Sequence, residues 1–184
     1  MKLFSFVALS CFLIFVSCNE ATTPVAQPDR PQAADADAIK KAVADAYSAI
    51  CFKPGEQPDY EHIKQCFIPE ATLINFGEDS MQVLGINQFI DYYKAFIDSN
   101  KISLFYEEEI QGNTDQFGRI AQRISSYKTY INSMDSVAQR GVNSFQTVKT
   151  AQGWKVSSII WDIETPALTI PGGYLNSTIK TDEK

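Results

Sequence analysis

Residues 102–163 read ISLFYEEEIQGNTDQFGRIAQRISSYKTYINSMDSVAQRGVNSFQTVKTAQGWKVSSIIWDI. Apolar, aromatic and β-branched residues recur through this stretch, and the pairs Gly112-Asn113 and Gln152-Gly153 are typical of turns. The pattern predicts four strands with no helix between them, at roughly 102–111, 117–131, 138–150 and 154–163. Each strand mixes polar and apolar residues, which indicates a sheet that is covered on one side only.

Helical spacing precedes this sheet. One face of a first helix is marked by the apolar residues Ile39, Val43, Ala46, Tyr47 and Ile50, and Lys53-Pro54-Gly55 ends it. We expect a short helix at about 60–67, a strand at 71–76, a loop at 77–85 and a third helix at 86–98. Helices followed by a meander of strands make an α+β domain. A curved sheet wrapped around the first helix would form a cone with an apolar mouth.

The amino terminus has the pattern of an export signal. Lys2 is followed by a short apolar run, and the small residue Ser17 precedes Cys18. Phe15-Val16-Ser17-Cys18 resembles a bacterial lipobox, so we expect cleavage after residue 17 and lipidation of Cys18. An ordinary cleaved signal with an incidental cysteine is the alternative. The lipobox predicts a lipid-anchored protein of the bacterial cell envelope, with the outer membrane or the periplasmic face favoured.

Composition divides the chain into four expected parts. They are a lipoprotein signal peptide at 1–17, a proline-rich flexible tether at 18–36, a folded domain at 37–165 and an irregular tail at 166–184. The net charge is −6, and the chain has no cluster of lysine or arginine. Binding to nucleic acid needs cationic contacts to phosphate, so no nucleic-acid partner is expected.

Three motifs resemble the nuclear transport factor 2-like (NTF2-like) superfamily, which includes the SnoaL-like and ketosteroid isomerase families. They are Phe67-Ile68-Pro69-Glu70-Ala71-Thr72-Leu73, Gly85-Ile86-Asn87-Gln88-Phe89 and the closing strand at 153–162. Residues 140–146, 161–166 and 170–175 further resemble a bacterial branch with no assigned activity. The resemblance implies three N-terminal helices packed on a strongly curved, mostly antiparallel sheet. It also implies a homodimer through the outer face of the sheet.

The same resemblance places two residues at catalytic positions. Ketosteroid isomerases use a tyrosine on the first helix as an oxyanion donor and an aspartate on the first strand as a base. Tyr47 falls at the first position and Asn75 at the second. An amide cannot take a proton in this way, so isomerase chemistry of the known kind is not expected. The alternative for Tyr47 is a core aromatic residue whose hydroxyl is hydrogen-bonded.

Other chemistry-bearing residues are few. His62 is the only histidine, and no metal-ligand motif or nucleotide-binding loop occurs, so neither a metal nor a cofactor is expected. Glu107 and Glu109 would share one face of a strand, and a solvated edge is the favoured interpretation of this acidic run. Cys51 and Cys66 form either a disulfide or two buried thiols.

The candidate pocket combines residues of the helices and of the last strands. Its expected lining is Tyr47, Asn75, Tyr93, Arg123, Arg140, Asn143, Gln146 and Asp162. Such a set could hold an anionic or amide-bearing ligand. Cross-strand pairing on the exposed face of the sheet is the alternative for the residues of the last strands.

Two functions stay open from the sequence. We favour a binding module at the cell envelope, whose partner is an unknown small molecule or an envelope protein. The alternative is a cofactor-free SnoaL-like enzyme (isomerase, cyclase, dehydratase or hydrolase) acting through Tyr47 and a carboxylate such as Asp59 or Asp162. A dry, roomy pocket that holds a carboxylate with a raised pKa would favour the enzyme.

Overall fold

The computed structural model describes residues 33–76 and 80–176. The expected signal peptide, Cys18 and most of the expected tether lie outside these residues. The helices and strands are α1 (Ala33–Ile50), α2 (Tyr60–Cys66), β1 (Phe67–Phe76), β2 (Met81–Gly85), α3 (Ile86–Asn100), β3 (Phe105–Phe117), β4 (Ile120–Ile131), β5 (Gln139–Thr150) and β6 (Gly153–Ile163). A short 3-10 turn follows at Gly172–Tyr174.

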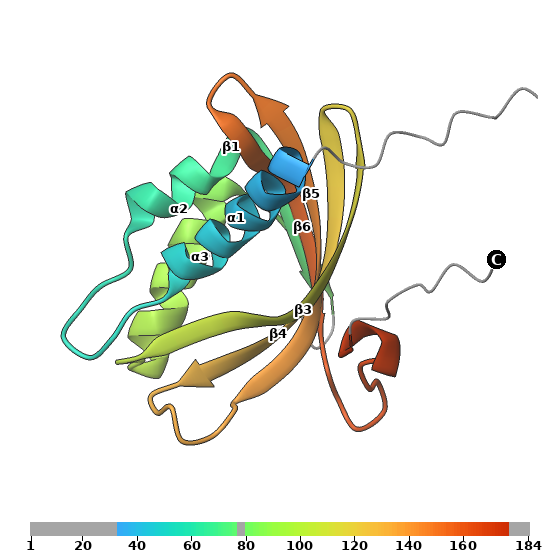
Figure 1. The fold of residues 1–184 in the computed structure, drawn as a ribbon. Helices are drawn as coiled ribbons and strands as arrows, with labels where there is room; N and C mark the ends of the chain where they lie inside the picture. Colours follow the sequence, from blue (N-terminus) through green and yellow to red (C-terminus); the bar gives the residue numbers. More distant parts are fainter. Residues whose placement is uncertain (1–32, 77–79, 177–184) are drawn as a thin grey trace, which may run out of the picture.

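The six strands form one bent sheet in the order β2-β1-β6-β5-β4-β3. Strands β1 and β6 pair in parallel, and the other neighbours pair antiparallel. Figure 1 shows the helices on one side of this sheet and the C-terminal segment on the other. The structure therefore confirms the predicted α+β class, with three helices on a curved, mostly antiparallel sheet.

The first helix begins at Ala33 rather than near Asp37. Asp35 lies inside the first turn, where a carboxylate is favourable next to the positive end of the helix dipole. Its carboxylate accepts hydrogen bonds from Lys149 Nζ at 2.6 Å and from the Trp154 indole at 3.3 Å. These bonds hold the start of α1 against β5 and β6.

The prediction of a turn at Gly112-Asn113 is wrong. Gly112 pairs with Ser125 in the middle of β3, and a Cβ at this position would collide with the Arg123 guanidinium. Glycine at position 112 leaves room for the Arg123 side chain to lie close to the backbone. Strand β3 therefore runs on past Gly112, and the turn comes at Gly118, whose φ is 55°. The expected loop at 77–85 also contains β2, which pairs with β1.

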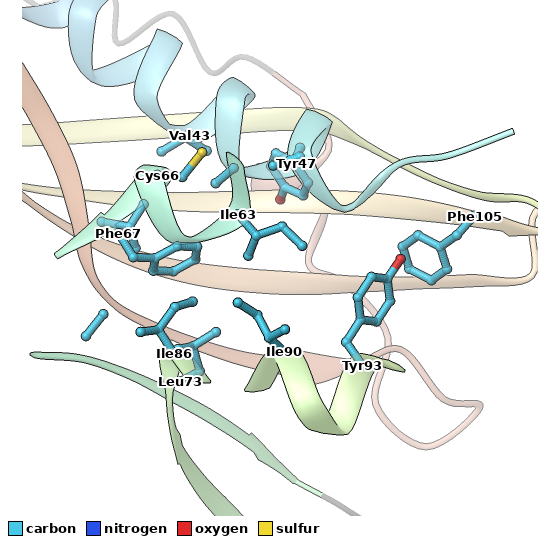
Figure 2. Packing of buried hydrophobic residues seen from close by; sticks show 14 of the residues in the cluster. Val43, Tyr47, Ile63, Cys66, Phe67, Leu73, Ile86, Ile90, Tyr93 and Phe105 are labelled. Carbon is cyan, nitrogen blue, oxygen red and sulfur yellow. The ribbon is translucent and has the colours of Figure 1, made fainter. Parts of the chain in front are cut away.

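The core lies between the helices and the concave face of the sheet. Figure 2 shows Val43 and Tyr47 of α1 close to Cys66 and Ile63 of α2 in this core. Leu73 is 2% exposed, and burying one such side chain contributes about 1.5–3 kcal/mol. Cys51 and Cys66 are both free thiols, so the structure has no bridge between them. None of the described helices is long and apolar enough to span a membrane.

The described part of the tail after β6, up to residue 176, is more ordered than expected. Ile170 is 8% exposed, and its amide donates to Glu164 Oε1 at 3.0 Å. Ser126 Oγ on the outer face of β4 donates to the Tyr174 carbonyl at 2.7 Å. The chain therefore covers part of its own outer sheet face, which the expected homodimer would also need. The homodimer stays a prediction.

Candidate functional site

A cavity of about 310 Å³ opens between the helices and the inner face of the sheet. Its wall is mostly aromatic and is built by Phe67, Phe76, Phe89, Tyr92, Tyr93, Phe96, Phe105, Tyr127, Phe145 and Trp161. Of the described residues that line it, Glu107 alone carries a charge. The volume lies at the lower end of the range for small-molecule sites, which is about 300–1,000 Å³.

The chain brings Glu107 into this cavity through the junction of α1 and β3. Just after α1, Phe52 exchanges backbone hydrogen bonds of 2.9 and 3.1 Å with Phe105 at the start of β3. Phe105 points into the core, and side chains alternate along a strand, so Glu107 points the same way. Thr129 is its cross-strand partner and donates its hydroxyl to Glu107 Oε2 at 2.7 Å.

Burial raises the pKa of Glu107 from 4.5 to about 7. Hydrogen bonds from Thr129 and Asn143 act in the opposite direction but do not offset the loss of solvation. Both the acid and the carboxylate are therefore present near neutral pH, which suits a group that gives and takes protons. The interpretation of residues 107–109 as a solvated edge is wrong for Glu107, although Glu108 does point outward and pairs with Lys128 at 2.9 Å.

Glu109, on the same face, stays charged. Burial alone would raise its pKa, but hydrogen bonds from Arg123 and Ser125 hold the pKa below its ordinary value. Arg123 Nε donates to Glu109 Oε2 at 2.8 Å and Nη2 donates to Oε1 at 2.5 Å, and the two side chains are 8% and 20% exposed. Arg123 Nη1 also donates to Thr114 at 2.6 Å. Arg123 and Glu109 thus form a bidentate, largely buried ion pair.

The hydroxyl of Tyr47 is already committed to the protein. Ser125 Oγ donates its single hydrogen to Glu109 at 2.7 Å, so Tyr47 is the donor in its 2.7 Å bond with Ser125. Asn143 Nδ2 donates in turn to the Tyr47 oxygen at 2.8 Å. Tyr47 therefore matches the alternative of a hydrogen-bonded core aromatic, and it has no hydrogen to offer an oxyanion in the cavity.

The eight expected pocket residues divide into two groups. Tyr47, Asn75, Tyr93 and Asn143 line the cavity. Arg123, Arg140, Gln146 and Asp162 do not. Strand alternation explains Arg140 and Gln146, because Asn143 and Phe145 of the same strand point inward.

On the outer face, Arg140, Gln146 and Asp162 each bond to a neighbouring residue. Arg140 pairs with Glu164 at 2.6 Å, Gln146 bonds Gln122 at 3.3 Å and Asp162 accepts the Ile163 amide. The expected anionic ligand thus loses its cationic partners. Asp59 caps α2 through the His62 amide at 2.9 Å and does not line the cavity either.

The sequence alone missed the other polar residues of the cavity, chiefly Glu107, Thr129, Tyr127 and Gln139. The Tyr127 hydroxyl accepts from Gln139 Nε2 at 3.3 Å and donates to no acceptor within the described part of the chain. Burial and the nearby Glu107 raise the pKa of Tyr127, so its phenol stays protonated. The apolar residue Phe105, two positions before Glu107 and therefore on the same strand face, was the one signal in the sequence that Glu107 could point inward.

Solved structures share this architecture. A protein of unknown function with a cystatin-like fold from Nostoc punctiforme is 14% identical with a TM-score of 0.61, over 76% of this chain and 98% of that one. An NTF2-like protein of unknown function from Shewanella baltica is 16% identical with a TM-score of 0.52, over 74% of this chain and 99% of that one. The chain has the NTF2-like fold.

A third NTF2-fold neighbour carries the name of an activity. It is a proposed aromatic ring hydroxylase from Novosphingobium aromaticivorans, 16% identical with a TM-score of 0.59, over 74% of this chain and 94% of that one. The sequence matches no family model and no curated protein. Because one fold hosts many activities, these likenesses extend to the NTF2-like fold and not to a reaction.

Metal ligation has no obvious place in this site. Among residues 33–76 and 80–176, no group of three or more histidine, cysteine, aspartate or glutamate side chains is arranged to hold an ion. The chemistry that the cavity residues themselves offer is hydrogen bonding, apolar contact and proton exchange at Glu107.

Proposed function

We propose that the cone binds a small, largely apolar molecule and that Glu107 exchanges a proton with it, as in a cofactor-free acid–base enzyme. The observation that supports this proposal is a carboxyl group with a pKa of about 7 in a cavity walled by aromatic rings. Perturbed carboxylates of this kind are concentrated at functional sites. The Cys18 motif supports a lipoprotein that holds this cavity at the cell envelope.

The contacts of Glu107 suit this role. Neutral donors, Thr129 and Asn143, orient the carboxyl group, whereas Glu109 on the same strand is neutralised by Arg123. Glu107 therefore keeps its proton affinity, and Glu109 does not. Tyr127 supplies a protonated hydroxyl to the same cavity and could stabilise negative charge that develops on a substrate.

A binding role without turnover is the second candidate. Two of the cavity's hydroxyls are already used by the protein, since Tyr47 donates to Ser125 and Tyr93 donates to the Ile50 carbonyl at 2.6 Å. Fewer hydroxyl groups then remain to donate a hydrogen bond or a proton to a substrate than in a site with free tyrosines.

A generic substrate for buried bases separates the two candidates. In 5-nitrobenzisoxazole, a base removes the proton on C3, the ring N–O bond breaks, and a cyanophenolate forms. We expect the protein to accelerate this ring opening in proportion to the ionised fraction of Glu107, so that the rate rises up to pH ~7 and then levels. Absorbance of the nitrophenolate product measures the rate.

Two variants make this test specific. Glu107→Gln is expected to lower the rate by roughly 100-fold, the scale of a lost general base. Glu108→Gln alters the outward neighbour and should leave the rate unchanged. Equal rates for the unmodified protein and Glu107→Gln at pH 8 would contradict an acid–base role, and saturable binding of the probe would then favour the binding module.

A further inference from the structure

We propose that the ligand of this cavity presents a basic nitrogen to Glu107, so that it binds as an aromatic or alicyclic ammonium ion. The inference rests on the proposed function in one respect, since both place the ligand in the same cavity. It goes beyond that function by naming the charge that the cavity selects.

The charges around the cavity favour a cationic ligand. No lysine, arginine or histidine is among the described residues that line it, and Glu107 gives it a negative centre. The arginines of the neighbouring strands are engaged elsewhere, Arg123 with Glu109 and Arg140 with Glu164. A carboxylate ligand would meet Glu107 in a site of low polarity, where like charges repel strongly, whereas an ammonium group would compensate it.

The aromatic wall of the cavity also favours a cation. Phe89 and Tyr93 stack with centroids 5.9 Å apart, and Trp161 meets Phe89 edge-on at 6.4 Å. Phe105 meets Tyr93 edge-on at 5.5 Å. Ring faces are negative and attract cations, so a carboxylate surrounded by aromatic rings is an arrangement that recognises ammonium groups. The same rings would bury the hydrocarbon part of the ligand.

Asn75 offers a hydrogen-bond acceptor for an N–H of the ligand. Its residue is 8% exposed and it lines the cavity, yet its side chain makes no hydrogen bond within the described chain. Because no protein group bonds to it, this cavity-facing amide can accept a ligand N–H at its carbonyl oxygen. Asn75 lies beside Trp161 in the register of β1 and β6, which places this acceptor at the aromatic wall.

Protons balance in either direction of binding. An ammonium ion pairs directly with the ionised Glu107. A neutral amine takes the proton of protonated Glu107, which gives the same ammonium–carboxylate pair. The reverse transfer would leave a neutral, nucleophilic amine and a protonated Glu107, and this links the ligand class to the acid–base role.

The pH dependence of affinity follows from the groups around Glu107. The titratable groups around it are Tyr47 of α1, Cys51 just after α1, Tyr93 of α3 and Tyr127 of β4, and burial raises the pKa of each. All four stay neutral near pH 7. On its own strand, Glu109 is held charged by Arg123 and Glu108 pairs with Lys128. Affinity for an amine should therefore fall when the pH drops below the value at which Glu107 is half-protonated. It should also fall when the pH rises above the pKa of the amine.

Calorimetry with three ligands on one ring system tests the proposal. They are 2-naphthylmethylamine, 2-naphthylmethanol and 2-naphthoate, titrated into the full chain at pH 7.5. We expect the amine to bind at least ~10-fold more tightly than the alcohol, a difference worth about 1.4 kcal/mol, and naphthoate to bind most weakly. Glu107→Gln should remove this preference for the amine and leave the affinity for the alcohol within about twofold.

Control variants keep the outcome interpretable. Asn75→Leu should weaken the amine, and Glu108→Gln should change nothing. Equal binding of amine and alcohol, tighter binding of naphthoate, an amine affinity that ignores Glu107→Gln, or no binding of any of the three would overturn the ligand class. If Glu107-dependent ring opening of 5-nitrobenzisoxazole persists in that event, the proposed function stands without it.

Discussion

Replacing Arg123 by methionine is expected to lower the free energy of unfolding by about 3–5 kcal/mol, because the variant leaves the largely buried Glu109 carboxylate without its cationic partner. The Arg123 side chain is 8% exposed and makes two hydrogen bonds to Glu109 and one to Thr114. Methionine fills similar space but cannot compensate the charge. Denaturant unfolding at pH 7.5 measures the loss.

A second arginine–glutamate pair gives the matched control. Arg140 pairs with Glu164 on the outer face, where the arginine side chain is 40% exposed, so Arg140→Met should cost no more than about 1 kcal/mol. Changing both Arg123→Met and Glu109→Leu should recover most of the loss. Equal losses for Arg123→Met and Arg140→Met would contradict the burial of the first pair.

The pH dependence provides an independent check on Arg123. The folded protein holds the pKa of Glu109 below its ordinary value, so the pair stabilises the fold above the unfolded pKa. That contribution is lost as the pH falls through the folded pKa. The difference between the unmodified protein and Arg123→Met should therefore shrink in acid.

Replacing Glu107 by glutamine is expected to stabilise the protein at pH 8. The folded pKa of about 7 lies above the ordinary value of 4.5, so the unfolded chain ionises first as the pH rises. Stability then falls between about pH 4.5 and 7, by roughly 3 kcal/mol in total, and Glu107→Gln removes this loss. Such a cost is typical of a residue retained for function rather than for stability.

Thermal unfolding across pH 4 to 8 measures this effect. Glu107→Gln and the unmodified protein should have similar unfolding temperatures at pH 4, where Glu107 is protonated in both the folded and the unfolded chain. The two temperatures should diverge as the pH rises. Glu108→Gln, on the outward face, should show no such divergence. A constant difference between Glu107→Gln and the unmodified protein at every pH would contradict a raised pKa.

Much of the fold could be predicted from the sequence because its signals are local. The helical spacing of Ile86, Ile90, Tyr93 and Ile97 predicts α3, and Gln152-Gly153 marks the turn before β6. The failures came from non-local contacts. Gly112 is typical of a turn until the guanidinium of Arg123, from the next strand, is placed against it.

The site was harder to predict than the fold. Strand alternation indicated that Glu107 and Glu109 share a face, but a pattern of period two does not tell which face is buried. The bridge between Phe52 and Phe105, made by residues far apart in the chain, decides it. Arg123 and Arg140 look equivalent in the sequence for the same reason, yet Arg123 is buried and Arg140 lies on the outer face.

The proposed function requires that Glu107 changes its charge near neutral pH inside the cone. Titration of the glutamate side-chain carboxyl carbons by ¹³C NMR tests it directly, and the signal of Glu107 is assigned by its absence in Glu107→Gln. The structure predicts a midpoint of about 7 for this signal. A midpoint at 4.5, the ordinary value for glutamate, would show that Glu107 is fully ionised at neutral pH and would contradict its proposed role.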